Sequence, residues 1–300
     1  LTLEATSTPA AEGDVNGEFT IRATHPSQEP VDIGYSISGS AANGTDYSDG
    51  ESPLSGSVTL PADQTSITIP IVVVDDTLVE GSEAVTLTLT SPLVGRVVID
   101  SGSAGKASVE IQDNDQALIS ITKLNDTGED GSPESFLISL DKPSQADLPI
   151  TFSIGGTADA SGLYQDYSLS SSDAVLAGTV ITIPGGSSSA HLTVTPVNDE
   201  IVEGSETVIV TLTAPTTGLV VVDEDNDTDT MTLSDNDTAT LTIASSGSPA
   251  EGGETGAFTI STSKISQAAV VIGYSISGPA PTGTEYPAGG GALSGSVPLP

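Results

Sequence analysis

Cysteine and tryptophan are absent from this 300-residue chain, and histidine occurs only as His25 and His191. Without cysteine there is no disulfide, no thiolate nucleophile and no cysteine-ligated zinc site. Two histidines are too few for most histidine-based metal sites or catalytic triads. Carboxylates, hydroxyls and amides are therefore the side chains left to carry any chemistry.

Positive charge is almost as scarce. The chain has 6 lysines and arginines against 41 aspartates and glutamates, which gives a formal net charge of -35. Such a chain repels phosphate backbones and anionic lipid headgroups. We therefore predict no nucleic-acid partner and no direct membrane contact. The sequence also lacks a run of about 18 apolar residues, the length that indicates a membrane-spanning helix.

No sustained helical periodicity occurs either. Instead, short runs rich in Val, Ile, Thr and Leu alternate with polar residues and are bounded by Gly, Pro, Asp and Ser. This pattern is typical of β-strands in a sandwich. Hydrophobic residues make up 36% of the chain, enough to build cores despite the high net charge. We predict an all-β protein.

Internal repeats organise the chain. VDIGYSISG at 31–39 returns as VVIGYSISG at 270–278, LPITFSIGG at 148–156 lies between them, and DND occurs at 113–115 and 235–237. The period is about 120 residues. We predict repeat 1 over residues 1–115, repeat 2 over 116–237 and the N-terminal half of repeat 3 over 238–300.

Seven strands are expected in repeat 1. They lie near 1–7, 17–24, 31–38, 56–60, 66–74, 84–90 and 106–111. The aromatic residues recur at matching places, and a repeated aromatic inside a strand is usually a core residue. Three such columns are predicted to be buried: Phe19, Phe136 and Phe258; Tyr35, Phe152 and Tyr274; Tyr47, Tyr167 and Tyr286.

Acidic residues recur just as regularly. DDTLVEGSE at 75–83 matches NDEIVEGSE at 198–206. If the seven strands run alternately up and down, the turns after strands 1, 3 and 5 and the end of strand 7 meet at one pole. We name the repeated acids of that pole the acidic tip; in repeat 1 it contains Glu12, Asp46, Asp75, Asp76, Glu80, Glu83, Asp113 and Asp115.

Such crowding requires a source of positive charge. Two unit charges about 4 Å apart repel by roughly 1 kcal/mol in water and about 4 kcal/mol at an effective dielectric of 20. The summed repulsion among eight carboxylates would exceed the roughly 5–15 kcal/mol by which a domain is stable, unless the carboxylates protonate, separate or bind cations. Oxygen ligands without histidine or cysteine suit Ca²⁺. We predict more than one Ca²⁺ at each tip.

The order of these residues resembles the Calx-beta domain. The resemblance rests on Glu12, Asp46-Tyr47, Leu-Pro at 60–61, Asp75-Asp76 followed by EGSE, and the closing DND, and it runs over the whole chain as two and a half copies. It implies a seven-stranded immunoglobulin-like antiparallel β-sandwich with Ca²⁺ at the distal loops. The turn at 61–63, PAD, and its counterpart PGG differ from the usual Pro-Gly-Glu of the family.

The resemblance also implies ligands in the later repeats. Those of repeat 2 are Glu129, Asp166, Asn198, Asp199, Glu203, Glu206, Asp235 and Asp237, and those of repeat 3 are Glu251 and Glu285. Asn198 replaces the first acid of the Asp-Asp pair, so repeat 2 is expected to bind Ca²⁺ more weakly. Glu285 stands where repeats 1 and 2 have aspartate, and further ligands of repeat 3 would lie beyond Pro300.

Two other motifs are candidate sites. DEDNDTD at 223–229 resembles the start of an EF-hand loop but lacks its glycine and its closing glutamate. It is either a solvated hairpin tip or an added Ca²⁺ contact that reaches the acidic tip of repeat 1. GYSISG lacks the spacing of a serine-nucleophile elbow and recurs as a core strand. We predict no enzymatic activity.

The functional prediction is a calcium-binding extracellular or cell-surface segment that rigidifies the stalk of a large adhesin-like protein. Only Gln116 separates DND from the next strand, so neighbouring repeats of the same chain, together with calcium ions, are the expected partners. The adhesive target stays open. The alternatives are a calcium-sensing regulatory domain of a membrane exchanger and an accessory module of a secreted hydrolase.

Overall fold

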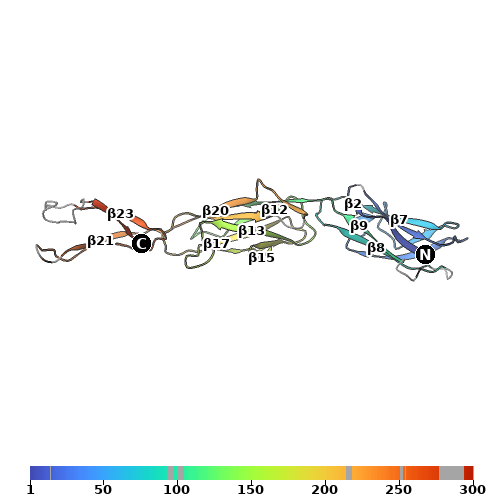
Figure 1. Ribbon diagram of the computed structural model, residues 1–300, viewed down its shortest axis with the longest axis horizontal. Coiled ribbons are helices and arrows are strands. Elements are labelled where there is room, and N and C mark those ends of the chain that lie inside the picture. The colour runs from blue at the N-terminus through green and yellow to red at the C-terminus, as the bar shows by residue number, and fades with distance from the viewer. Residues whose placement is uncertain are drawn as a thin grey trace.

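A computed structural model describes residues 1–13, 15–92, 97–100, 105–213, 218–250, 253, 255–276 and 294–299. Three β-rich bodies follow one another along a long, narrow molecule (Figure 1). All regular elements of the described residues are β-strands, which confirms the predicted fold class. Among these residues there is no helix with the length and apolar character needed to cross a bilayer.

Repeat 1 is a sandwich of two sheets. Its strands are β1 (Thr2–Ser7), β2 (Ala10–Ala11), β3 (Gly17–Arg22), β4 (Val31–Gly39), β5 (Tyr47–Ser48), β6 (Ser57–Leu60), β7 (Ser66–Val73), β8 (Glu83–Pro92) and β9 (Lys106–Gln112). One sheet has the order β1-β3-β7-β5 and the other the order β2-β9-β8-β4-β6. Each of the seven predicted strands has a counterpart among them.

Repeat 2 has the same architecture with additional short strands. Its strands are β10 (Ala117–Lys123), β11 (Thr127–Gly128), β12 (Glu134–Leu140), β13 (Leu148–Gly156), β14 (Tyr167–Ser170), β15 (Val175–Ala177), β16 (Val180–Ile183), β17 (Ser189–Pro196), β18 (Glu206–Thr213), β19 (Val220–Val222) and β20 (Thr228–Ser234). The sheets run β14-β17-β12-β10-β19 and β11-β20-β18-β13-β16-β15.

The N-terminal segment of each repeat contributes one strand to each sheet. β1 pairs antiparallel with β3, whereas β2, three residues further on, pairs parallel with β9. In repeat 2, β10 pairs with β12 and β11 pairs parallel with β20. The change of sheet brings the residue after β2 or β11 beside the end of the last strand of the repeat. This residue is Glu12 in repeat 1 and Glu129 in repeat 2.

Alternation of apolar residues along the strands fills the space between the sheets of repeats 1 and 2. The predicted aromatic columns are buried there: Phe19, Tyr35 and Tyr47 in repeat 1, and Phe136, Phe152 and Tyr167 in repeat 2. Burial of such large rings contributes much of the hydrophobic stabilisation of a small domain. These cores provide the rigid frame that carries the acidic loops.

Repeat 3 differs from this expectation. Its described part consists of two hairpins, β21 (Leu241–Ser246) with β22 (Ala257–Thr262) and β23 (Val270–Ser275) with β24 (Ser294–Leu299). Phe258 is 67% exposed and Tyr274 is 40% exposed, so the prediction that they are core residues is wrong for this structure. Phe258 lies on one two-stranded hairpin and Tyr274 on the other, and among the described residues neither hairpin belongs to a larger sheet that would bury the ring. Tyr286 lies outside the described residues.

Candidate metal centres

The loop between β7 and β8 positions much of the acidic tip of repeat 1. Its first residue, Val74, donates its backbone N–H to the carbonyl oxygen of Asp46 at 2.9 Å, which ties the loop to the turn before β5. Gly81 has φ of +86°, a backbone conformation that side chains other than glycine rarely adopt. This turn lets two successive N–H groups, those of Glu80 and Gly81, face the end of β9.

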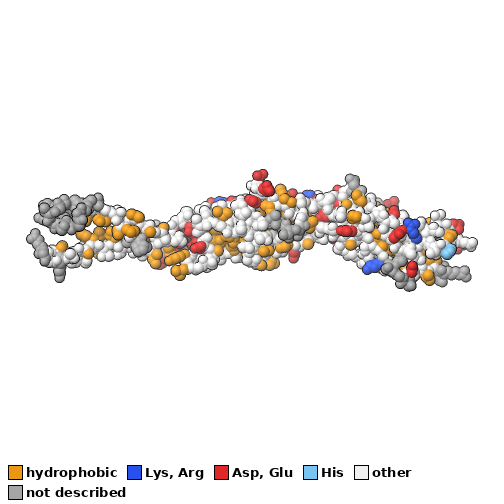
Figure 2. All heavy atoms as spheres, viewed as in Figure 1, with side chains coloured by type: hydrophobic (Ala, Val, Ile, Leu, Met, Phe, Trp, Pro, Cys, Tyr) orange, Lys and Arg blue, Asp and Glu red, His pale blue; other side chains and the backbone are white. Residues whose placement is uncertain are grey.

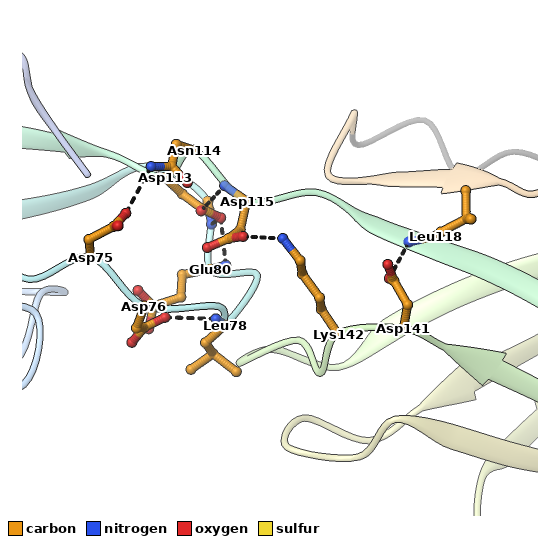
Figure 3. A network of polar contacts seen from close by, with 11 residues as sticks. Asp75, Asp76, Leu78, Glu80, Asp113, Asn114, Asp115, Leu118, Asp141 and Lys142 are labelled. Carbon is orange, nitrogen blue, oxygen red and sulfur yellow. Dashed lines mark hydrogen bonds and ion pairs between the residues drawn. The ribbon is translucent and has the colours of Figure 1, made fainter. Parts of the chain in front are cut away.

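Asp113 receives those two N–H groups. Its Oδ2 accepts them at 2.8 and 3.0 Å, and its Oδ1 accepts the N–H of Asp115 at 2.6 Å. The contact with Glu80 and the one with Asp115 are drawn in Figure 3. Asp113 therefore holds the β7–β8 loop against the DND segment and fixes where the neighbouring carboxylates point.

The first cluster of carboxylates joins the start and the end of repeat 1. Glu12, Asp113 and Asp115 each offer an oxygen, and these oxygens lie within 4.8 Å of one another. Glu12 is 7% exposed and Asp115 is 8% exposed. Glu12 Oε2 and Asp115 Oδ2 are buried oxygens without a hydrogen-bond partner. Buried polar atoms normally have a partner, so these oxygens indicate a place for a ligand.

The second cluster joins the β7–β8 loop and the start of β8 to the turn before β5. It consists of Asp46, Glu80 and Glu83, whose ligand oxygens also lie within 4.8 Å of one another. Asp46 Oδ2 accepts the backbone N–H of Ala42 at 2.5 Å, which orients the carboxylate. The eight predicted ligands of repeat 1 thus contribute six residues to two clusters.

Asp75 and Asp76 belong to neither cluster. Asp75 Oδ1 accepts a hydrogen bond from the side-chain amide of Asn114 at 3.0 Å, and Asp76 Oδ1 accepts one from the backbone of Leu78 at 2.7 Å. Both contacts are visible in Figure 3. In this structure they shape the loop around the clusters.

Repeat 2 also has two clusters, with one member changed. They are Glu129 with Asp199 and Asp237, and Asp166 with Glu203 and Glu206. Asp199 is the counterpart of Asp76, and it is a member here where Asp235, the counterpart of Asp113, is not. Asp235 takes the organising role of Asp113, because its Oδ2 accepts the N–H groups of Glu203 and Gly204 at 2.8 and 3.1 Å. Glu129 Oε2, Glu203 Oε1 and Asp237 Oδ2 are again buried without a partner.

Asn198 replaces Asp75 in a position outside these clusters. Its Oδ1 accepts a hydrogen bond from Asn236 at 2.8 Å, just as Asp75 accepts one from Asn114. The substitution therefore removes a charge near the clusters, and Asn198, like Asp75, is a member of neither cluster of its repeat. In repeat 3, the predicted ligands Glu251 and Glu285 lie outside the described residues.

Mutual repulsion and burial raise the pKa of the glutamates in all four clusters. For Glu12, desolvation by burial is the main cause, followed by the charges of Asp113 and Asp76, and the pKa rises to about 7. The same causes raise the pKa of Glu80, Glu83, Glu129 and Glu203 to about 7 and that of Glu206 to about 8. Glu83 and Glu206 are also hydrogen-bonded to a neighbouring carboxyl, that of Asp46 or Asp166. A divalent cation would favour the ionised forms instead.

These shifts predict an unusual pH dependence for calcium-depleted protein. Between pH 4.5 and about 7 the folded glutamates hold protons that the unfolded chain has released, so the free energy of unfolding decreases as pH rises. Carboxyls with a lowered pKa, such as Asp49 and Asp126, act in the opposite direction but below this window. We expect a higher melting temperature at pH 5 than at pH 7.5 in calorimetry without Ca²⁺. A melting temperature that increases over this range would contradict the assignment.

The acidic run 223–229 lies elsewhere. Asp223 donates its N–H to the carbonyl of Ile119, and Asp229 Oδ2 accepts the N–H of Lys123, so the run is fixed beside β10. All its described hydrogen bonds are within repeat 2. In Figure 1 the turn before β20 projects from the side of repeat 2. This placement favours the solvated hairpin over a contact with the tip of repeat 1.

The acidic tip of repeat 1 also contacts the next repeat. Lys142, in the loop between β12 and β13, forms an ion pair with Asp115 (Figure 3). Gln145 Nε2 donates to Glu80 Oε1 at 2.7 Å. Val79, in the middle of the β7–β8 loop, is 1% exposed and belongs to the hydrophobic cluster of repeat 2. Residues of two repeats therefore surround the same carboxylates.

The junction between repeats 2 and 3 is built in the same way. Lys264 pairs with Asp237, and Val202 exchanges backbone hydrogen bonds with Ile265 and Gln267. Sequence analysis missed these contacts. The sequence does contain a signal for them: KPSQ at 142–145 recurs as KISQ at 264–267, with nearly the same spacing as the repeated acidic segments at 75–83 and 198–206.

The donor set fits a hard divalent cation. Each cluster offers carboxylate oxygens only, and backbone hydrogen bonds hold several of them in place while other buried oxygens stay without a partner. Ca²⁺ takes 6–8 oxygen ligands and tolerates irregular geometry, so carboxylates, backbone carbonyls and water could complete its shell. This donor set suits the binding of a cation.

The chain is similar to a known domain family and to several solved structures. The model of the Calx-beta domain matches residues 1–115 and 176–244, more than half of the chain. No curated protein sequence matches. Among solved structures, CBD12 from CALX1.2 is 14% identical, with a TM-score of 0.32 over 78% of this chain and 99% of that chain.

Two further solved structures are similar at the same level. The apo-form Calx CBD1 domain is 20% identical, with a TM-score of 0.29 over 38% of this chain and 100% of that chain. The Yersinia pseudotuberculosis adhesin InvE is 12% identical, with a TM-score of 0.36 over 78% of this chain and 58% of that chain.

Proposed function

The chain belongs to the Calx-beta domain family, and we propose that it is a non-enzymatic calcium-binding segment that stiffens an extracellular or cell-surface stalk. The observation that carries the proposal is the set of buried carboxylate oxygens without partners inside the clusters of repeats 1 and 2. Leaving such charges uncompensated in the folded state is costly. Bound Ca²⁺ removes that cost.

The stiffening role rests on the position of the clusters. Asp115 and Glu80 each belong to a cluster and also contact a side chain of the next repeat, Lys142 or Gln145. An ion that immobilises these carboxylates therefore also immobilises one side of the junction. The short connection through Gln116, whose side chain donates to the carbonyl of Gly218 in repeat 2, leaves little free chain between the repeats.

An extracellular location would supply enough calcium for sites of this kind. Calcium sites in extracellular modules bind with dissociation constants of about 10⁻⁴–10⁻³ M. Millimolar calcium outside cells would fill such sites, whereas cytosolic calcium would not. The net charge of -35 also keeps a long chain soluble and prevents it from adhering to nucleic acid. A large adhesin-like protein is the setting that these properties fit.

Calcium titration tests the proposal. We expect at least four Ca²⁺ per chain, one for each cluster of repeats 1 and 2, by isothermal calorimetry of chelator-treated protein at pH 7.5. Mg²⁺ requires a smaller and more regular shell, so the same titration with Mg²⁺ should show much weaker binding. Fewer than four ions, or equal binding of both metals, would count against these clusters as calcium sites.

A further inference from the structure

The two junctions share one docking arrangement. In repeat 2 the acceptor loop, Lys142-Pro143-Ser144-Gln145, receives Val79: the valine N–H donates to Pro143 O at 3.0 Å, and Gln145 N–H donates to Val79 O at 2.9 Å. Val79 and Ser144 form a parallel β-bridge. In repeat 3 the acceptor loop is 264–267, and it receives Val202 with the corresponding distances of 2.8 and 3.1 Å.

Repeat 1 contains the same acceptor loop. His25-Pro26-Ser27-Gln28 connects β3 to β4, as the other two loops connect β12 to β13 and β22 to β23. Histidine stands where the others have lysine; it can carry the same positive charge or donate an N–H to a carboxylate. The proline, serine and glutamine of repeat 2 are all retained.

The backbone of this loop already has the docking conformation. Asp63 N–H donates to Ser27 O at 2.7 Å, and in repeat 2 Gly186 N–H donates to Ser144 O at 2.7 Å. Asp63 and Gly186 both have positive φ, +59° and +79°. Asp63 is the one non-glycine residue with positive φ among the described residues. Repeat 1 therefore keeps this turn although it has aspartate at the position where glycine would adopt positive φ most easily.

The two loops differ in whether a residue of another repeat packs on them. In repeat 2 Val79 lies on the acceptor loop, and Ser144 is 6% exposed. In repeat 1 the side chains of His25, Pro26 and Gln28 are exposed and Ser27 is half-buried. The loop belongs to the end of repeat 1 that faces away from repeat 2 (Figure 1).

We propose that residues 25–28 are a docking surface for the acidic tip of another Calx-beta repeat, one with valine before the EGSE glutamates and a closing aspartate. The valine backbone pairs with Ser27 and Gln28, and the closing aspartate faces His25. The partner is specified by its chemistry: an acidic loop with one central apolar residue. The inference rests on the observed junctions and holds whether or not the tips bind calcium.

A cysteine pair tests the docking directly, because the chain has no cysteine of its own. Residues 116–240 are placed before Leu1 of the full chain, so that Leu1 follows Thr240 as Leu241 does. Ser27→Cys is combined with Val202→Cys in the added copy, and disulfide formation is followed on a gel under mild oxidation. Val79→Cys with Ser144→Cys in the unmodified chain is the positive control. Ser27→Cys with Val175→Cys of the added copy measures random collisions.

The new pair should form its disulfide to within a few-fold of the rate of the Val79–Ser144 control pair, with and without Ca²⁺. Formation no faster than that of the Val175 pair would overturn the proposal. If Ca²⁺ changed the rate of neither pair, the result would count against stiffening by calcium, the proposed function, and would leave the docking inference standing. In the cysteine-free extended chain, docking also predicts slower hydrogen exchange of the Gln28 amide by about tenfold or more. Unchanged exchange of this amide on extension would contradict docking even if a cysteine variant failed to fold.

Discussion

Replacing Glu80 and Glu83 together by glutamine removes most of the calcium-dependent rise in melting temperature that repeat 1 contributes. The two glutamates form the second cluster with Asp46, and glutamine keeps their size but not their charge. A filled site at a hundredfold excess of ligand stabilises the folded state by about 2.7 kcal/mol. For a domain of this size each kcal/mol shifts the melting temperature by roughly 3–4 °C, so we expect a loss of about 10 °C.

The sign of the effect reverses without calcium. In chelator at pH 7.5 the double variant should be at least as stable as the parent, because it no longer confines ionisable groups whose pKa is raised to about 7. Differential scanning calorimetry measures both effects, once with Ca²⁺ at about a hundredfold excess over its dissociation constant and once in chelator. A variant that destabilises equally in both conditions would indicate a packing role for these residues.

The matched control changes the same charge away from the tip. Glu29→Gln with Glu51→Gln alters two exposed side chains of repeat 1 and should leave the calcium-dependent increment unchanged. Glu203→Gln with Glu206→Gln should reduce the increment of repeat 2 only, since its cluster is formed within that repeat. An unchanged increment in the Glu80 and Glu83 variant would refute the assignment of this cluster.

Chelation is expected to turn the chain from a straight rod into a flexible series of folded repeats. The cores contain no cluster residue, so they stay folded, whereas the loop from Asp75 to Glu83 loses the ions that hold its carboxylates. That loop carries Val79 and Glu80, which contact repeat 2. Small-angle scattering of the 300-residue chain should show a smaller maximum dimension and a smaller radius of gyration in chelator than in millimolar Ca²⁺.

A variant at the junction separates the two causes of stiffness. Val79→Ser removes the apolar contact with repeat 2 and leaves every cluster carboxylate in place. It should still bind calcium but should be more compact on average than the parent chain in Ca²⁺. Identical scattering of the parent chain in Ca²⁺ and chelator would refute the stiffening mechanism even if titration showed that the ions bind.

The sequence by itself determined the fold class and the chemistry of the tips. Alternation with a period of two in stretches such as 134–140 is a local property, because every second side chain of a strand points to the same face. Oxygen-only ligands follow from composition, since cysteine is absent and the two histidines do not recur with the acidic phrases. Alternating strand directions also suffice to predict that Glu12 and Asp115 meet.

Only the tertiary structure decided which acids share a cluster and which residues join the repeats. Asp75 and Asp113 are both repeated loop acids in the sequence and look equally suited as ligands. In the structure, Asp75 accepts a hydrogen bond from the Asn114 side chain, whereas Asp113 accepts two backbone N–H groups of the β7–β8 loop. Val79 appears as one apolar residue in a polar loop, and its burial depends on a surface more than 60 residues later in the chain. Phe258 has the sequence environment of Phe19 but stays exposed. Burial of a side chain and clustering of carboxylates both require partners from distant segments of the chain. The local sequence pattern carries no information on how those segments are placed relative to one another in the folded protein.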